Sequence, residues 1–265
     1  MGTAGTMRGF SIVLVCATLA GTFVIRPAAA EPCALRLGWS TFAPFQMPGR
    51  DGVPDGLDMD IFRHVAKAAG CTIAEYRRAP WGRLLKEVEL GRIDAVLSAS
   101  FTEERNAFGR YSQAYRSVVY AAVFHGKAPA EAGPLPADRL LAGHPRIGVY
   151  HDAYLPAPVM AEVKRAEGAD RVYSGYSYEK MIDLLEIGRL DTVLLEVVKP
   201  DCTFPKIDND PAFKVVPFAG TAGQLHVLFS RRTVEAETVA RISAAIRRFV
   251  GSDGYKALFR KYLRR

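Results

Sequence analysis

Arg105 stands where a short apolar strand gives way to a helix, in the stretch DAVLSASFTEERNAF (residues 94–108). The apolar run 95–97 predicts a buried strand, and Ser98 and Ser100 follow it. A cation in the first turn of a helix opposes the helix dipole, which favours anions at that end. An arginine in this place therefore suggests a ligand, because the planar guanidinium can donate two parallel hydrogen bonds to a carboxylate.

The chain repeats the unit that carries this arginine. Residues 81–100 (WGRLLKEVELGRIDAVLSAS) resemble residues 178–197 (YEKMIDLLEIGRLDTVLLEV), and ELGRIDAVL matches EIGRLDTVL at six of nine positions. Each copy predicts an amphipathic helix, a left-handed cap at Gly91 or Gly188, and a short buried strand. The second strand ends in Glu196 instead of a serine loop.

A second pair of similar segments lies upstream of each copy, LRLGWSTFAP (35–44) and PRIGVYHDAYLP (145–156). The alternation of strands and helices predicts two related α/β lobes with parallel sheets. Ligands of such sheets bind beyond the carboxyl ends of the strands. We therefore expect a small molecule between the lobes, bound by four loops at residues 39–45, 98–105, 150–154 and 195–197.

Two cysteines precede strand-like segments, Cys33 before LRLGW and Cys71 before TIAEY. If these strands are parallel neighbours, about 4.8 Å apart, their first residues lie side by side. That spacing suits a disulfide, and we predict a Cys33–Cys71 bond. Cys202 is then left as a free thiol.

The first 30 residues predict a secretory signal peptide. Arg8 precedes an apolar run at residues 10–25, which is shorter than the roughly 20 residues that span a bilayer, and Ala28-Ala29-Ala30 supplies a cleavage site. An uncleaved anchor is the alternative. We expect a soluble protein exported to the periplasm.

Charge and motifs exclude several classes of function. The chain of 265 residues carries a formal charge of +7, but its basic residues are scattered, so we expect no nucleic-acid partner. No P-loop, G-x-S-x-G, H-E-x-x-H or zinc-type cysteine pair occurs, and the five histidines show no ligand spacing. We expect no metal, no cofactor and no catalytic residues.

Four motifs in a fixed order within residues 34–200 carry a family resemblance. They are LRLGWSTFAPF, DGVPDGLDMDIFRHVAKAAG, GRIDAVLSASFTEERNAFGRYSQAY and GRLDTVLLE. Together they resemble the bacterial periplasmic solute-binding proteins of family 3, the polar amino-acid transporter type. The resemblance implies an α/β, two-lobed periplasmic-binding-protein-like fold, each lobe a mostly parallel sheet flanked by helices, joined by two hinge strands. It places lobe 1 at residues 31–120 plus 222–265, lobe 2 at 126–216, and the hinge at 121–125 and 217–221.

The resemblance also implies roles for side chains. Arg105 matches the arginine that clamps the ligand carboxylate, and Glu196 matches the acid, usually Asp, that receives the ammonium. Phe42 matches an aromatic residue that stacks on the ligand. The predicted ligand-binding set is Phe42, Trp81, Ser98, Ser100, Arg105, Tyr154 and Glu196.

Each of these residues has a structural alternative. Arg105 could instead pair with Glu103 or Glu104 on the surface, and Glu196 could be a solvated acid. The aromatic side chains could belong to the core, and the two serines could only permit a tight turn. Asp58 and Asp60 are expected to cap and start the following helix.

One departure from the family pattern lies in the second lobe. The family usually has Gly-Thr after its V-G-V-x-x strand, where the threonine and backbone amides help to hold the carboxylate. Here Asp152-Ala153 takes that place, so a donor is lost and an acid is introduced. This weakens the case for an ordinary α-amino acid, and another small polar or anionic solute is an alternative.

The resemblance implies a monomeric binding protein of an ABC-type importer. It would capture a small polar solute, an amino acid or related carboxylate, and deliver it to a membrane permease. Two alternatives stay open. One is an accessory or sensor protein associated with a redox enzyme system, and the other is a cyclohexadienyl dehydratase-like enzyme on the same fold.

Overall fold

The computed structural model describes residues 1–2, 33–131, 133–143, 145–198 and 205–263. Every described helix and strand lies within residues 32–265. Apart from its first two residues, the predicted signal peptide lies outside the described residues, and so does Cys202.

Lobe 1 contains a sheet in the order β2-β1-β3-β10, with β4 paired to β10. Strand β1 is parallel to β2 and β3, whereas β10 is antiparallel to β3. The strands are β1 (Cys33–Trp39), β2 (Cys71–Arg78), β3 (Ala95–Ser100), β4 (Gly109–Tyr111) and β10 (Gly223–Ser230). The helices are η1 (Arg50–Gly52), α1 (Leu57–Ala68), α2 (Trp81–Glu89), α3 (Glu103–Phe108), α8 (Ala236–Phe249) and α9 (Asp253–Tyr262).

Lobe 2 repeats this arrangement in a shorter form. Strand β6 is parallel to both β7 and β8. The strands are β6 (Ile147–Tyr150), β7 (Val172–Gly175), β8 (Thr192–Val197) and β9 (Phe213–Pro217). The helices are α4 (Ala137–Leu140), α5 (Ala157–Glu167), α6 (Tyr178–Glu186) and α7 (Pro205–Asn209).

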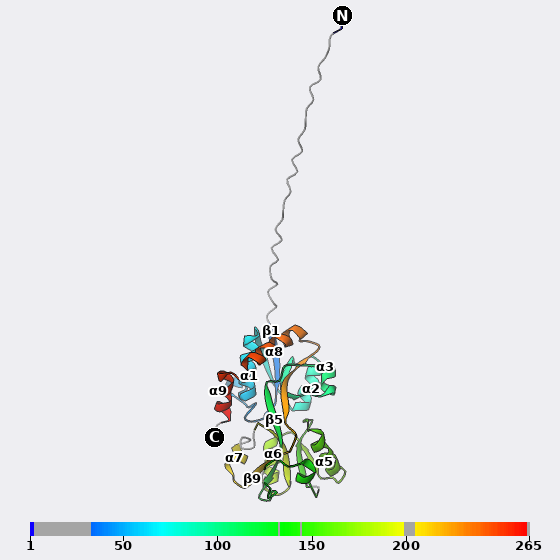
Figure 1. The fold of residues 1–265 in the computed structure, drawn as a ribbon, viewed down its shortest axis with the longest axis vertical. Coiled ribbons are helices and arrows are strands. Elements are labelled where there is room, and N and C mark those ends of the chain that lie inside the picture. The colour runs from blue at the N-terminus through cyan, green and yellow to red at the C-terminus, as the bar shows by residue number, and fades with distance from the viewer. Residues whose placement is uncertain (3–32, 132, 144, 199–204, 264–265) are drawn as a thin grey trace. The chain divides into compact units, whose positions relative to one another are not determined.

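The long strand β5 (Arg116–His125) takes part in both sheets. Its residues 116–118 pair with β10, residues 119–123 pair with β8, and residues 121–125 pair with β9. Figure 1 shows β5 passing from the group of helices that includes α1, α2 and α3 to the group that includes α5 and α6. One continuous strand therefore belongs to the sheets of both lobes.

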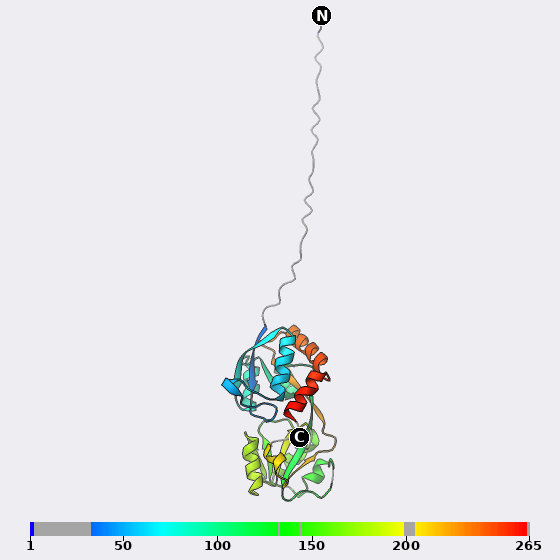
Figure 2. The same cartoon turned by 90° about the vertical axis from the view of Figure 1, so that its left-hand side faces the viewer.

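The last two helices pack on the first lobe, as predicted. Helix α8 ends at Phe249, and Ser252 caps α9 by accepting a hydrogen bond from the backbone N–H of Tyr255. The ring of Phe249 stacks on His64 of α1, with centroids 3.9 Å apart. Figure 2 shows α8 and α9, in orange and red, beside the cyan helix α1.

The internal repeat is confirmed in atomic detail by two matching ion pairs. Arg36 of β1 binds Asp94 through its backbone N–H, Nε and Nη2, at 2.8, 2.9 and 2.6 Å. Arg146 binds Asp191 through the same three groups, at 2.8, 2.9 and 2.7 Å. In lobe 1 the arginine lies within β1 and binds the aspartate just before β3, and in lobe 2 it lies just before β6 and binds the aspartate just before β8.

The helix ends of the repeat are also as predicted. After α2 and α6, Gly91 and Gly188 adopt φ values of 73° and 70°. This left-handed conformation is one that glycine adopts without the steric cost of a Cβ.

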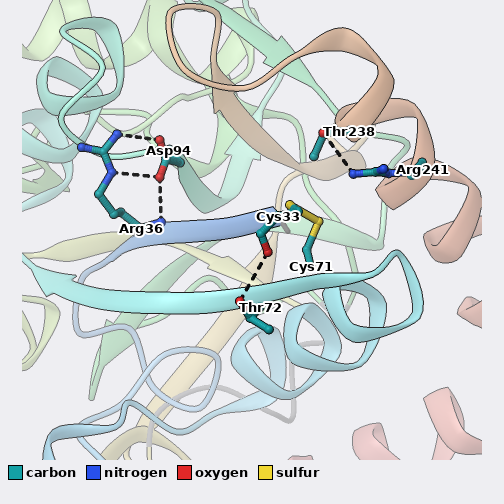
Figure 3. The surroundings of a disulfide bond; sticks show 7 residues. All are labelled: Cys33, Arg36, Cys71, Thr72, Asp94, Thr238 and Arg241. Carbon is teal, nitrogen blue, oxygen red and sulfur yellow. Dashed lines mark hydrogen bonds and ion pairs between the residues drawn. A yellow bond between two sulfur atoms is a disulfide. The ribbon is translucent and has the colours of Figure 1, made fainter. Parts of the chain in front are cut away.

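The predicted disulfide is present and joins the first residues of neighbouring strands. Cys33 and Cys71 are direct partners in the parallel β1–β2 register, with Cα atoms 4.5 Å apart. Figure 3 shows the bond, and beside it Thr72 donating a hydrogen bond to the backbone carbonyl of Cys33. The reasoning from parallel strands to a disulfide is therefore confirmed.

Candidate ligand-binding site

A cavity lies where the four predicted loops converge, and its wall comes from both lobes. All seven side chains of the predicted set line it: Phe42, Trp81, Ser98, Ser100, Arg105, Tyr154 and Glu196. The other lining residues are Ser40, Thr41, Gln46, Tyr150, Ala153 and Tyr178. The structure thus brings the predicted residues together, and their role in binding stays a prediction.

The cavity is small. It holds about 50 Å³, on a scale where one water needs about 10–15 Å³. It shares Arg105, Ala153 and Tyr154 with an outer hollow of about 430 Å³, and Ser40, Thr41 and Tyr150 with another of about 470 Å³. A solute enclosed in the central cavity must be compact.

Arg105 is only 8% exposed and turns toward the cavity instead of the surface. Its Nη1 donates to the Ser100 carbonyl at 3.2 Å, and its Nη2 donates to the Asp152 carbonyl at 3.1 Å. Its guanidinium carbon lies 5.6 Å from the centre of the Trp81 ring. The Thr102 side chain caps α3 by accepting from the backbone N–H of Arg105, which fixes the start of the helix. The helix dipole alone would disfavour a cation at this end of α3. The two hydrogen bonds and the contact with the Trp81 ring therefore hold the guanidinium in place.

The alternative that Arg105 pairs with Glu103 or Glu104 is not what the structure shows. Within the described ranges, no ion pair joins Arg105 to either acid. Both acids lie in the first turn of α3 and are exposed, where their charge suits the helix dipole.

Both serines line the cavity, but their hydroxyls have different partners. Ser98 adopts a left-handed φ of 58°, accepts a hydrogen bond from the Gln46 amide at 2.9 Å, and donates to Asp58. The Ser100 hydroxyl lies 2.9 Å from that of Tyr120. Because the Ser98 hydroxyl donates its proton to Asp58, the Ser98 oxygen can only accept hydrogen bonds from other groups.

A buried ion pair lies next to the loop that contains Ser98, which donates to one of its members, Asp58. Arg116 and Asp58 have side chains that are 1% and 0% exposed, and Arg116 donates to both carboxylate oxygens, at 2.6 and 3.0 Å. The guanidinium also lies 4.1 Å from the centre of the Phe45 ring. Removing one member of such a pair leaves an uncompensated buried charge, so the pair anchors the loop.

The interpretation of Asp58 and Asp60 as helix caps is wrong. Helix α1 starts after Gly56, and no side chain caps it. Both acids do lie in its first turn, but Asp58 binds Arg116 and Asp60 binds Arg63 and Lys261. Each carboxylate instead forms an ion pair with a residue of another element, Asp58 with Arg116 and Asp60 with Lys261.

Glu196 faces Arg105 from the other lobe. Burial raises the pKa of its carboxyl to about 7, while the positive charges of Arg116 and Arg105 and a hydrogen bond with Tyr120 act in the opposite direction. Glu196 and Tyr120 are direct partners across β8 and β5. The side chain is half-buried and lines the cavity. Near neutral pH this carboxyl can therefore hold or release a proton.

Aromatic rings form the rest of the wall. Tyr178 lies 5.3 Å from Phe42 and 4.9 Å from Tyr150, and Tyr154 lies 6.0 Å from Tyr120, measured between ring centres. Burial raises the pKa of Tyr178 well above its usual value, and the nearby Glu196 charge adds to this. The wall is therefore mainly apolar, with one cation and one acid at its edge.

Sequence reasoning missed two lining residues, Gln46 and Tyr178. Gln46 lies one position beyond the predicted loop at 39–45. Tyr178 had a signal in the repeat, because it aligns with Trp81, and each is the first residue of its helix. The repeat could have identified Tyr178.

No cluster of three or more His, Cys, Asp or Glu side chains that could hold a metal occurs among the residues described. In the same part of the chain, no helix has the length and apolar character needed to cross a membrane.

Comparison with known proteins identifies the family. The model of the bacterial extracellular solute-binding proteins, family 3, matches residues 35–265. The chain belongs to this family. A search of curated protein sequences gave no match.

Solved structures similar to this solute-binding protein share its fold. An ancestral arginine-binding protein bound to arginine has a TM-score of 0.70 at 20% identity, covering 86% of this chain and 97% of that chain. An arginine-, lysine-, histidine-binding protein from Geobacillus stearothermophilus has a TM-score of 0.68 at 20% identity, covering 88% and 96%. A histidine kinase sensor domain with similarity to periplasmic binding proteins has a TM-score of 0.69 at 19% identity, covering 88% and 96%. The predicted α/β, two-lobed fold class is confirmed.

Proposed function

We propose that this solute-binding protein captures a small zwitterion between Arg105 and Glu196. The opposite charges of these two residues carry the proposal, because they face one small cavity from different lobes. A carboxylate would accept from Arg105, and an ammonium group would bind ionised Glu196. Phe42, Trp81, Tyr154 and Tyr178 would enclose the apolar part, while Ser98 and Ser100 would meet polar atoms.

The size of the cavity favours compact amino acids. A volume of about 50 Å³ corresponds to a few water molecules, which suits solutes near the size of glycine, alanine or serine. A long side chain such as that of arginine would have to extend into one of the outer hollows.

The cellular setting follows from the same proposal. Residues 1–30 would direct export and be removed, and the disulfide suits the oxidising periplasm. The protein would act as a monomer that delivers its solute to the permease of an ABC-type importer. Lobe 1 at 31–120 plus 222–265 and lobe 2 at 126–216 would close about the hinge at 121–125 and 217–221.

Thermal unfolding in the presence of single solutes tests the proposal. A ligand that binds only the folded state raises its stability, so the 20 amino acids, small organic acids and polyamines should be compared at equal concentration. We expect the largest shift from a small neutral amino acid. A shift from polyamines alone would refute a zwitterion site.

One observation favours a second candidate, an enzyme that removes carbon dioxide and water from prephenate. A carboxyl whose pKa is about 7 can donate a proton to a bound substrate, and protonation would help the ring hydroxyl to leave as water. Prephenate is larger than the central cavity, so it would have to extend into an outer hollow. Release of phenylpyruvate from prephenate, lost in Glu196→Gln, would establish this activity. Binding of prephenate without turnover would refute it.

A further inference from the structure

The segment Tyr150–Asp152 of lobe 2 lies against the first turn of α2 in lobe 1. The backbone N–H of Trp81 lies near the Tyr150 hydroxyl and acts to lower the pKa of the phenol. The Asp152 carboxylate lies so close to Gly82 that a Cβ added there would be 1.9 Å from Oδ2. These two contacts join elements of different lobes at the edge of the cavity.

Helix α2 has no cap of its own at this end. Its N-cap residue is Pro80, no side chain caps it, and its first turn contains no acid. The first amides of a helix lack intrahelical partners and carry partial positive charge. The Tyr150 oxygen and the Asp152 carboxylate place two acceptor groups, one of them negatively charged, beside this end of α2.

The counterpart helix in the repeat shows the difference. Helix α6 begins after Ser177, whose hydroxyl accepts from the Lys180 backbone N–H at 3.2 Å, and Glu179 lies in its first turn. Of the two related helices, α6 is thus capped within its own lobe. Only α2 receives its acceptors from the opposite lobe.

The same segment also fixes the two lobe 1 side chains that meet at the cavity. Trp81 is the first residue of α2, and Arg105 stacks on its ring. Arg105 also donates to the backbone carbonyl of Asp152, whose left-handed φ of 61° directs the chain back toward α2. His151 Nδ1 lies 2.7 Å from Asp152 Oδ2.

We propose that Tyr150 and Asp152 form an interlobe cap, which completes helix α2, positions Trp81 and Arg105, and holds the lobes together without a solute. Gly82 is part of this cap, because a side chain there would displace the Asp152 carboxylate. The inference goes beyond the proposed function, since protein groups alone make its contacts. It implies that ligand-free protein already populates the closed arrangement.

Interlobe distances measured by electron spin resonance test this cap. Spin labels on Lys164→Cys of α5 and Arg247→Cys of α8, both exposed, would report on the two lobes. Cys202 is replaced by serine in every variant, and carried-over solute is removed by unfolding and refolding. We expect the ligand-free parent protein to show a substantial population at the short, closed distance.

Gly82→Ala is the decisive variant. Its φ lies outside the left-handed region and alanine is favoured in helices, so α2 itself should be as stable as before. We expect the closed population to fall, because the new Cβ would displace the Asp152 carboxylate from its place beside α2. Asp152→Gly should reduce the closed population to a similar extent, since both variants remove the carboxylate from the start of α2.

The double variant Gly82→Ala/Asp152→Gly shows whether Gly82→Ala acts through the contact with Asp152 or through a change within α2. In the Asp152→Gly background, Gly82→Ala should have no further effect, because the side chain it would strike is gone. The cap would be refuted if Gly82→Ala left the distances unchanged, or if it acted equally in both backgrounds. It would also be refuted if the ligand-free parent were entirely open. None of these outcomes depends on which solute binds.

Discussion

Arg105 and Asp152 meet across the cleft, with Arg105 Nη2 3.1 Å from the backbone carbonyl oxygen of Asp152. The family resemblance leads one to expect a donor at this place in lobe 2. The chain instead presents an acceptor, which binds one of the guanidinium N–H groups. We infer that lobe 1 alone supplies the strong donors for a ligand carboxylate, whereas lobe 2 supplies the acid Glu196.

Replacing Arg105 by alanine should weaken binding of the cognate solute by about 30-fold or more. Truncating one partner of a buried, hydrogen-bonded charge pair costs about 2 kcal/mol or more, which corresponds to that factor. Calorimetric titration would measure it. Arg110→Ala is a matched control, because Arg110 donates to the carbonyls of Arg231 and Val234 and is not among the residues that line the cavity. Equal losses in both variants would show that Arg105 has no special role.

Affinity for an amino acid should fall as the pH drops below about 7. The Glu196 pKa is raised to about 7, mainly by burial, so the carboxyl is protonated below that pH. A bound ammonium group favours the ionised form, so binding must then release a proton, and affinity should fall by up to about tenfold per pH unit. Above pH 7 the carboxylate is already ionised and affinity should level off, until the solute itself loses its proton.

Glu196→Gln provides the control for this pH dependence. The amide does not titrate, so affinity should be weaker at pH 8 and nearly constant between pH 5 and 8. Titrations at several pH values would measure both proteins. A parent protein whose affinity is the same at pH 5.5 and 8 would contradict an ammonium site at Glu196.

The two repeated ion pairs should differ in their contribution to stability. Asp94 and Asp191 accept the same three hydrogen bonds from their arginines, but Asp94 also accepts one from Thr233 Oγ1 at 2.6 Å, and their side chains are 8% and 44% exposed. We expect Asp94→Ala to lower the free energy of unfolding by about 2 kcal/mol or more, and Asp191→Ala by about 1 kcal/mol or less. Urea unfolding of both variants would test this, and equal losses would show that burial does not decide the difference.

The disulfide should contribute about 4 kcal/mol to the free energy of unfolding. Cys33 and Cys71 are separated by 38 residues, and the loop-entropy estimate for that length gives about this value. Unfolding of Cys33→Ser/Cys71→Ser would measure it. A reductant should destabilise the parent protein and leave the double variant unchanged, and a loss well below about 1 kcal/mol would contradict the estimate.

The architecture was predictable because it is repeated within the chain. Two copies of a helix, a glycine and a strand imply two lobes, and the carboxyl ends of their strands imply the loops that meet. Glu196 was found in this way, since it lies near the end of the strand in the second copy. Arg105 lies beyond the matching strand, in α3, and its role was implied by the family resemblance. Cys33 and Cys71 were found because parallel neighbouring strands place their first residues together.

Contacts between distant segments were not predictable in the same way. No pattern joins Asp58 to Arg116, because the pair depends on how α1 meets β5. The local rule for helix starts instead favoured a capping role for Asp58. The interlobe contact of Asp152 with Gly82 was hidden for the same reason, since it depends on how two lobes meet.

Thermal unfolding of the parent protein and of Arg105→Ala with small zwitterions tests the central claim most directly. The account predicts that at least one compact amino acid raises the unfolding temperature of the parent protein and of Arg110→Ala, and that this shift is lost in Arg105→Ala. It would be contradicted if no small zwitterion stabilised the parent protein, or if Arg105→Ala kept the full shift.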